Sequence, residues 1–146
     1  MTAVLGLDDR PQARAQFKIA AAAAAGVTYT PLDLAKIYRM PPGTDGAGQT
    51  LAIIELGGGF GQGYLDTYFS GLGIATPTVT TVGGDGAVNT AGKDPQVADG
   101  EVLLDIEVAG AIAPKVGIVV YFAPNTDAGV LDAVSTAAHA TPTRPR

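Results

Sequence analysis

Three short apolar runs, each followed by a turn and a helical pattern, dominate the middle of the chain. The runs have the length and aliphatic content of β-strands and span residues 51–56, 78–82 and 116–122. Segments with helical spacing follow them and span residues 64–72, 101–113 and 127–139. This alternation predicts an α/β fold with a parallel sheet of about three strands and right-handed crossover helices.

The first strand is predicted to be buried on both faces, because its residues are almost all aliphatic. Upstream, Thr30-Pro31-Leu32-Asp33 has the pattern of a capped helix start. Residues 1–27 show no periodic apolar face and are interpreted as a linker. A sheet of only three strands leaves an unpaired apolar edge on the third strand or its neighbour. Residues 28–146 are therefore interpreted as the N-terminal portion of a larger α/β domain.

The amino-acid composition excludes or disfavours several classes of function. The chain has 146 residues with a formal net charge of −5, which disfavours a nucleic-acid binder. It has no cysteine, which excludes disulfides and thiolate metal sites, and one histidine, His139, which excludes a site that needs two. Neither a membrane span nor a signal peptide is expected, because the apolar stretches are short and the N-terminus lacks a basic leader.

The glycine cluster at residues 57–63 could indicate a nucleotide site, but its spacing does not give GxGxxG and no P-loop ending follows. A tight turn that lets two backbones approach closely is the better interpretation. His139 stands at a predicted helix C-terminus, where the helix dipole favours it. It is interpreted as structural.

Three acids in the helix predicted over residues 101–113 are the informative feature. The helix is apolar on all sides, which is typical of a buried helix. Glu101 and Asp105 lie one turn apart on one face, with no Lys or Arg in the helix to neutralise them. Such a pair is expected to share a proton, with one pKa raised, as in an acid/base site. From the spacing alone, an ordinary solvent-facing stripe is the preferred interpretation of this pair, and it is preferred more strongly for Glu107, which points elsewhere.

Glu55 is a second anomaly, because it ends an aliphatic strand just before the glycine turn. The carboxyl ends of parallel strands are where sites form. A functional and a surface interpretation of Glu55 are equally open at this point.

Four long motifs resemble the sedolisin family of serine-carboxyl peptidases, and its kumamolisin-like branch in particular. They follow the family's order through nearly all of residues 29–140 and occupy residues 29–33, 53–59, 99–111 and 120–127. Leu5-Gly6-Leu7-Asp8 resembles the tail of the family's propeptide.

The resemblance implies a subtilisin-like fold and an acid-active endopeptidase with a Ser-Glu-Asp triad. Glu101 matches the general base, Asp105 its partner, and Glu55 an acid hydrogen-bonded to the base. It further implies polypeptide substrates, no nucleic-acid or membrane partner, and secretion as a zymogen. Residues 1–27 would be the propeptide tail, cut between Phe17 and Val27.

The chain departs from the family in its nucleophile. The family's Gly-Thr-Ser segment does not occur, and Ser70 and Ser135 lie in other contexts. The oxyanion-hole Asp and the calcium ligands of the intact family have no match either. A truncated peptidase chain, inactive on its own, is therefore expected, since triad members act as a unit. A non-catalytic α/β module that binds a partner through its sheet edge is the alternative; a nucleotide-binding domain is a third and is disfavoured by the glycine spacing.

Overall fold

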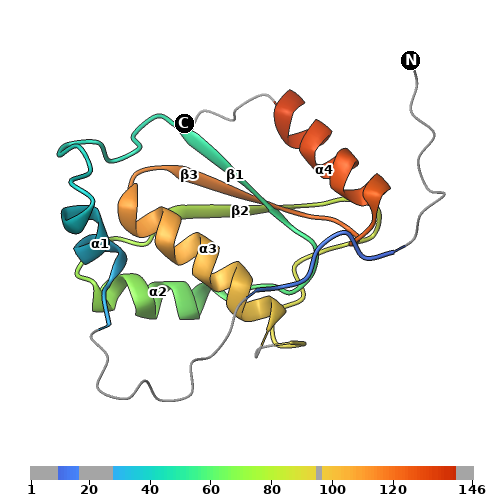
Figure 1. Ribbon diagram of the computed structural model, residues 1–146, viewed down its shortest axis with the longest axis horizontal. Helices are drawn as coiled ribbons and strands as arrows, with labels where there is room; N and C mark the ends of the chain where they lie inside the picture. The colour runs from blue at the N-terminus through green and yellow to red at the C-terminus, as the bar shows by residue number, and fades with distance from the viewer. Residues whose placement is uncertain (1–9, 17–27, 95–96, 141–146) are drawn as a thin grey trace.

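The computed structural model describes residues 10–16, 28–94 and 97–140. These residues form four helices and three strands that alternate as the apolar pattern predicts (Figure 1). In chain order they are α1 (Pro31–Ile37), β1 (Thr50–Glu55), α2 (Gln62–Gly71), β2 (Thr78–Gly83), α3 (Ala98–Ile112), β3 (Gly117–Phe122) and α4 (Asp127–His139). The α/β class and the three-stranded parallel sheet are confirmed.

The sheet has the order β1-β3-β2, with all neighbours parallel. Thr50 of β1 and Thr78 of β2 both stand opposite Gly117 of β3, so the strands end level with one another. The third strand therefore has no bare edge; the edges of the described sheet belong to its two neighbours. The last strand enters between the first two because its apolar residues then have neighbours on both sides.

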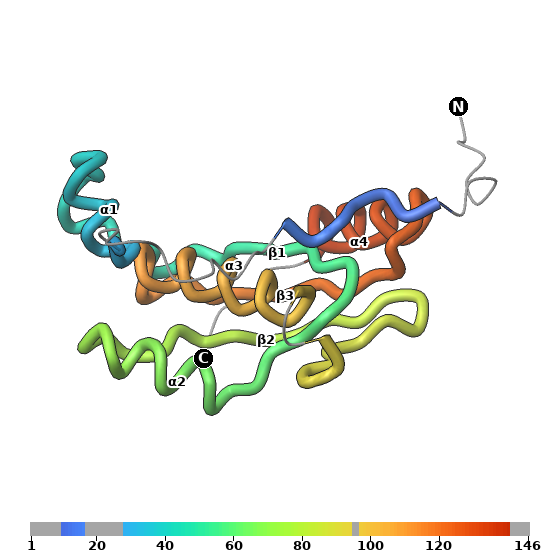
Figure 2. Tube along the Cα trace, turned by 60° about the horizontal axis from the view of Figure 1, so that its bottom comes forward, coloured from blue at the N-terminus to red at the C-terminus, as the bar shows by residue number. Residues whose placement is uncertain are grey.

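Helices cover both faces of the sheet (Figure 2). Alternate residues of β3 point to opposite faces: Ile118, Val120 and Phe122 join the larger core with α2 and α3. Tyr121 joins a smaller core with Ala133 of α4. The chain thus forms three layers, with two helices on one face and one on the other.

Two crossover connections lie on the face of the sheet that carries the larger core, and they have opposite handedness. The connection through α2 steps from β1 to the far edge, and the connection through α3 steps back to the centre. Because both helices pack on the same face, one of the two connections must be left-handed. The expectation that both are right-handed is wrong. The long segment between β2 and α3 gives the chain the length to return on the same face.

β1 is less buried than its sequence predicts. Its first three residues are exposed and Leu51 keeps 39% of its surface, whereas Glu55 at its end keeps 7%. The strand is an edge strand, so a continuous apolar run here does not mean cover on both faces. Its carboxyl half is covered by the helices, and that half carries the acid.

Helix α1 begins as predicted. The Thr30 side chain accepts a hydrogen bond from the Asp33 backbone N–H, and the Asp33 carboxylate accepts one from the Thr30 backbone N–H, which completes a capping box. Helix α3 differs from its prediction. Val102 and Ile106 are fully buried, but Leu104 and Val108 are 43% and 41% exposed, because no described element covers that side. No helix among the described residues is long and apolar enough to cross a membrane.

Candidate active site

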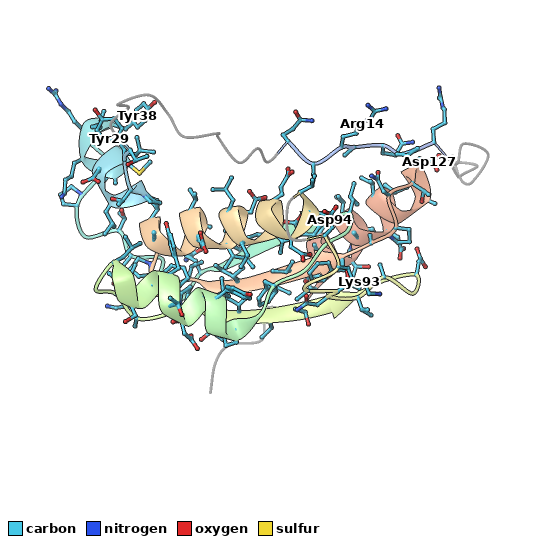
Figure 3. All side chains as sticks on the ribbon, turned by 90° about the horizontal axis from the view of Figure 1, so that it is seen from below. Arg14, Tyr29, Tyr38, Lys93, Asp94 and Asp127 are labelled. Atoms are coloured by element: carbon cyan, nitrogen blue, oxygen red, sulfur yellow. The ribbon has the colours of Figure 1, made fainter. Side chains whose placement is uncertain are left out.

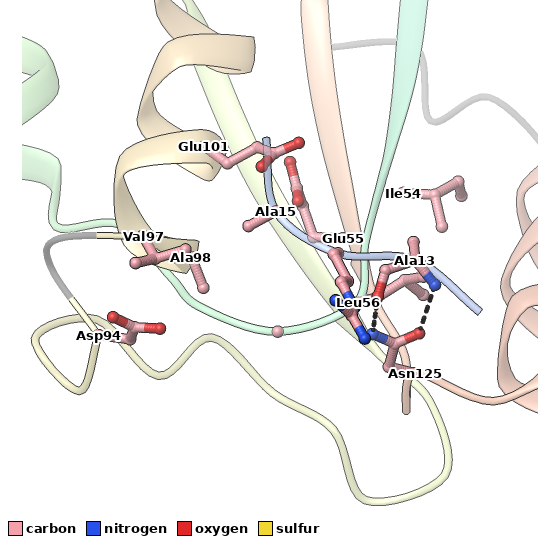
Figure 4. Close-up of a pocket in the computed structure, with 12 residues that line it drawn as sticks. Ala13, Ala15, Ile54, Glu55, Leu56, Asp94, Val97, Ala98, Glu101 and Asn125 are labelled. Atoms are coloured by element: carbon pink, nitrogen blue, oxygen red, sulfur yellow. Dashed lines mark hydrogen bonds between the residues drawn. The ribbon is translucent and has the colours of Figure 1, made fainter. Parts of the chain in front are cut away.

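A groove of about 530 Å³ lies where the strands end and α3 begins. The end of β1 and the following turn form its floor, the first turn of α3 forms one wall, and Asn125, just after β3, stands at its other end (Figure 4). Topology explains the location, because the carboxyl ends of three parallel strands and the amino end of a helix meet here.

Two acids from distant parts of the sequence face each other in this groove. The carboxyl groups of Glu55 and Glu101 point toward one another from β1 and α3 (Figure 4). Glu55 is buried, and one of its oxygens has no hydrogen-bond partner. Burial, followed by the negative charges of Asp105 and Glu101, raises the pKa of Glu55 to about 8. Glu55 is therefore protonated through the acid and neutral range.

Asp105 completes the acid cluster from the next turn of α3. Its side chain is more exposed than that of Glu55. Burial and the neighbouring Glu101 raise the pKa of Asp105 above its ordinary value. The structure thus brings together Glu55, Glu101 and Asp105, and they interact electrostatically. The catalytic role of each stays a prediction.

Glu107 and His139 lie away from this cluster. Glu107 is half-buried on the side of α3 that faces Tyr68 of α2, and burial raises its pKa. It is therefore less solvent-exposed than predicted, because α2 packs beside it. His139 ends α4 with an exposed ring whose Nδ1 lies 2.8 Å from the Ser135 carbonyl oxygen. Neither Ser135 nor Ser70, both exposed on helices, lines the groove.

The glycine cluster forms the predicted tight turn and brings a distant loop against the site. Gly58 has φ 71°, and a Cβ there would lie 2.6 Å from the carbonyl carbon of Ala98 in α3. A Cβ on Gly59 would overlap the Asn89 side chain. Asn89 uses both ends of its carboxamide, accepting from the Phe60 N–H and donating to the Phe60 carbonyl, each at 2.9 Å. The turn is therefore bonded to the loop before α3.

Replacing Gly59 with Ala is expected to destabilise the protein by about 1–3 kcal/mol, because the added methyl group meets backbone that cannot move freely. Gly63 is the matched control: it lies in α2 with open space around its Cβ position, and Ala there is expected to stabilise by up to about 1 kcal/mol. Urea unfolding of both variants measures the difference. Equal effects of the two substitutions would contradict the close approach.

Sequence reasoning missed three residues at or beside the groove: Asn125 lines it, and Asn89 and Asp99 bond the loop before α3 to its surroundings. Asp99 is 4% exposed; one carboxylate oxygen accepts from the Gly92 N–H at 2.7 Å and the other has no hydrogen-bond partner. Asp99 thereby attaches the long loop to the first turn of α3. Neither periodicity nor local spacing distinguishes these residues from ordinary turn formers, since their partners are set by the tertiary structure.

Part of the segment interpreted as a linker lines one side of the groove. Residues 10–16 run past Asn125 toward α3, with the exposed Arg14 side chain directed away from the body of the protein (Figure 3). The Gln16 N–H donates to a carboxylate oxygen of Glu101. The groove therefore accommodates a polypeptide main chain. The cleavage expected between Phe17 and Val27 falls outside the described residues.

A metal site does not arise from this arrangement. Within residues 10–16, 28–94 and 97–140, no three His, Cys, Asp or Glu side chains gather in a way that could hold an ion. The acid cluster lacks the set of oxygen ligands that calcium requires. The described residues therefore do not form a calcium site of the kind that the family resemblance implies.

Comparison with known proteins gives one informative relative. No protein-family model matches the chain. The chain is 53% identical over 147 residues to kumamolisin from Bacillus sp. (strain MN-32). This match covers 94% of the chain but 27% of kumamolisin, so the chain spans about a quarter of the length of that relative. Along almost its whole length, the chain is thus similar to a part of kumamolisin, a sedolisin-family peptidase.

Proposed function

We propose that this chain forms the general-base part of an acid-active serine-carboxyl endopeptidase. Glu101 is the base, Asp105 its partner, and Glu55 the acid that supports the pair. The observation that carries the proposal is a main-chain N–H in the groove that donates to Glu101, next to two further acids with raised pKa values. The groove thus combines peptide binding with acid/base groups.

The chemistry follows from the position of Glu101. Hydrolysis of a peptide bond through a seryl ester needs a base that takes the hydroxyl proton and then gives it to the departing amide nitrogen. The Glu101 carboxylate accepts a hydrogen bond from the Gln16 backbone N–H, so it lies within reach of a peptide main chain. Asp105 and Glu55 adjoin it and can hold or return a proton.

Carboxyl groups suit this role in acid. An ordinary carboxyl group is ionised from about pH 4 upward, whereas a histidine is protonated there and cannot act as a base. Glu55, with its pKa of about 8, stays protonated under the same conditions and can donate a hydrogen bond to an ionised neighbour. Glu55 is therefore a neutral donor in the acid range.

The rest of the proposed enzyme comes from outside this sequence. The nucleophilic serine, the oxyanion-hole donor and a calcium site would be supplied by the parts that kumamolisin has beyond the match. The whole enzyme would adopt a subtilisin-like fold, act on polypeptides and be secreted as a zymogen with residues 1–27 as its propeptide tail. Residues 10–16 in the groove are consistent with that tail.

The purified 146-residue chain is expected to show no turnover of a peptide substrate between about pH 3 and 5. The reason is that a base without a nucleophile and an oxyanion donor has nothing to activate. Release of a fluorescent group from a quenched peptide measures this. Turnover that the Glu101→Gln substitution abolishes would contradict the expected inactivity.

A chimera tests the assigned chemistry directly. Residues 28–140 of this chain replace the corresponding residues of kumamolisin, so that all missing parts are present. The folded chimera is expected to hydrolyse an acid-range peptide substrate. A folded chimera without activity would overturn the proposed function.

A further inference from the structure

One side chain holds the backbone of the segment in the groove. The Asn125 Oδ1 accepts hydrogen bonds from the backbone N–H groups of Gln12 and Ala13, at 2.8 and 3.0 Å. Its Nδ2 donates to the Ala13 carbonyl oxygen at 2.7 Å (Figure 4). The carboxamide thus uses its acceptor twice and its donor once, and all three bonds go to main-chain atoms.

Asn125 is held in place by the turn that contains it. The preceding Pro124 fixes the backbone, and its carbonyl accepts from the Thr126 N–H at 2.8 Å. Thr126 in turn caps α4 by accepting from the Gly129 N–H at 3.1 Å. Gly129 packs against the Pro124 carbonyl so closely that a Cβ would overlap it. The backbone that carries Asn125 is therefore fixed by its own turn, which reduces the entropy lost on binding.

The bonds to Asn125 carry no information about the side chains of the bound segment. The Gln12 side chain donates to the Arg10 carbonyl within the segment, and Ala13 has only a methyl group. Any two consecutive residues that have free N–H groups and adopt the same bend could present the same three groups.

We propose that Asn125 is the main-chain clamp of the peptide-binding groove. It holds the main chain at a bend, three residues before the residue whose N–H meets Glu101, and it does so independently of sequence. The assignment of that polypeptide as substrate rests on the proposed function; the clamp itself rests on the hydrogen bonds. Asn125 is a binding residue, which sets the register of the peptide relative to Glu101.

Amide hydrogen exchange in the ¹⁵N-labelled 146-residue chain tests the clamp without any catalysis. In the native chain, the amides of Gln12 and Ala13 are expected to be protected. Asn125→Leu removes both hydrogen-bonding groups at similar size, and is expected to lower this protection at least about tenfold, since each lost bond contributes roughly 1 kcal/mol. Asn125→Asp keeps the acceptor but places a carboxylate oxygen against the Ala13 carbonyl oxygen, and is expected to lower the protection less than Asn125→Leu does. Unchanged protection of the β3 amide of Val120 shows in each variant that the fold is intact.

Changes in the segment separate backbone recognition from side-chain recognition. Ala13→Ser and Gln12→Ala leave the main chain intact and are expected to leave the protection within about twofold. Ala13→Pro removes an N–H and is expected to abolish the protection of Gln12 as well, because the bond geometry is lost. Unprotected amides in the native chain, or protection that survives Asn125→Leu, would overturn the clamp. Loss of protection with Ala13→Ser would overturn its independence of sequence.

The chimera with kumamolisin distinguishes this inference from the proposed function. There, Asn125→Leu is expected to raise KM about tenfold or more and leave kcat within about threefold, as for binding that is equal in the ground and transition states. An inactive chimera together with the expected exchange results would overturn the proposed function and leave the clamp. An active chimera whose KM does not respond to Asn125→Leu would overturn the clamp as a substrate-binding residue.

Discussion

Replacing Glu101 with Gln in the kumamolisin chimera is expected to lower kcat/KM for an acid-range peptide by at least about 10³-fold, because general-base catalysis alone contributes about 10²–10⁴ and triad members act together. Gln has the same shape and can still accept a hydrogen bond from a peptide N–H, as Glu101 does from Gln16. The substitution therefore removes the base and keeps the contact. Initial rates measured across the acid range, divided by the concentration of folded protein, give the size of the effect.

Glu107 provides the matched control. It lies on the same helix, half-buried and with a raised pKa, but it faces Tyr68 and not the groove. Glu107→Gln is therefore expected to leave kcat/KM within about threefold. Equal losses from the two substitutions would show that the helix needs its charges for folding. A Glu101→Gln chimera with near-native activity would refute the assignment of the base.

The second large effect concerns Glu55 and stability. Folding raises the pKa of Glu55 from 4.5 to about 8, so the folded state favours its protonated form. Its contribution to the free energy of unfolding is therefore complete below about pH 4.5 and is lost as the pH rises through about 8. The expected loss relative to a neutral side chain is on the order of 3–5 kcal/mol, since one pKa unit corresponds to about 1.4 kcal/mol.

The measurement is urea unfolding of the native chain and of Glu55→Gln at several pH values from 4 to 9. The stability of the native chain is expected to fall relative to that of Glu55→Gln as the pH rises, because Gln stays neutral. Asp105, whose pKa is also raised, contributes in the same direction in both proteins and cancels in the comparison. Asp132→Asn, at an exposed position on α4, is expected to follow the native curve. Parallel curves for the native chain and Glu55→Gln would contradict the burial of a protonated Glu55.

The two effects are connected through the groove. A buried Glu55 that keeps its proton places a neutral donor beside Glu101 at acid pH, and the same burial makes its ionisation at higher pH costly. Acid-range function and reduced stability at alkaline pH would thus have one physical cause.

The elements of this protein could be predicted from the sequence because their signals are local. The capping box of Thr30 and Asp33 and the Thr126 cap of α4 need only neighbours a turn away. Apolar runs of six or seven residues predict strands, and the spacing of Glu101 and Asp105 puts them on one face of any helix they form. The family motifs then add the expected roles of these acids.

What the sequence determined by itself was therefore the type and order of the elements, the position of the glycine turn and the identity of the acid pair. The tertiary structure alone decided that β3 lies between β1 and β2, that one crossover is left-handed, and that Glu55 is buried opposite Glu101. It also decided that Asn125 meets the backbone of residues 12 and 13. These contacts join residues from about 30 to more than 100 positions apart, and only the packing of the sheet and its helices brings such residues together.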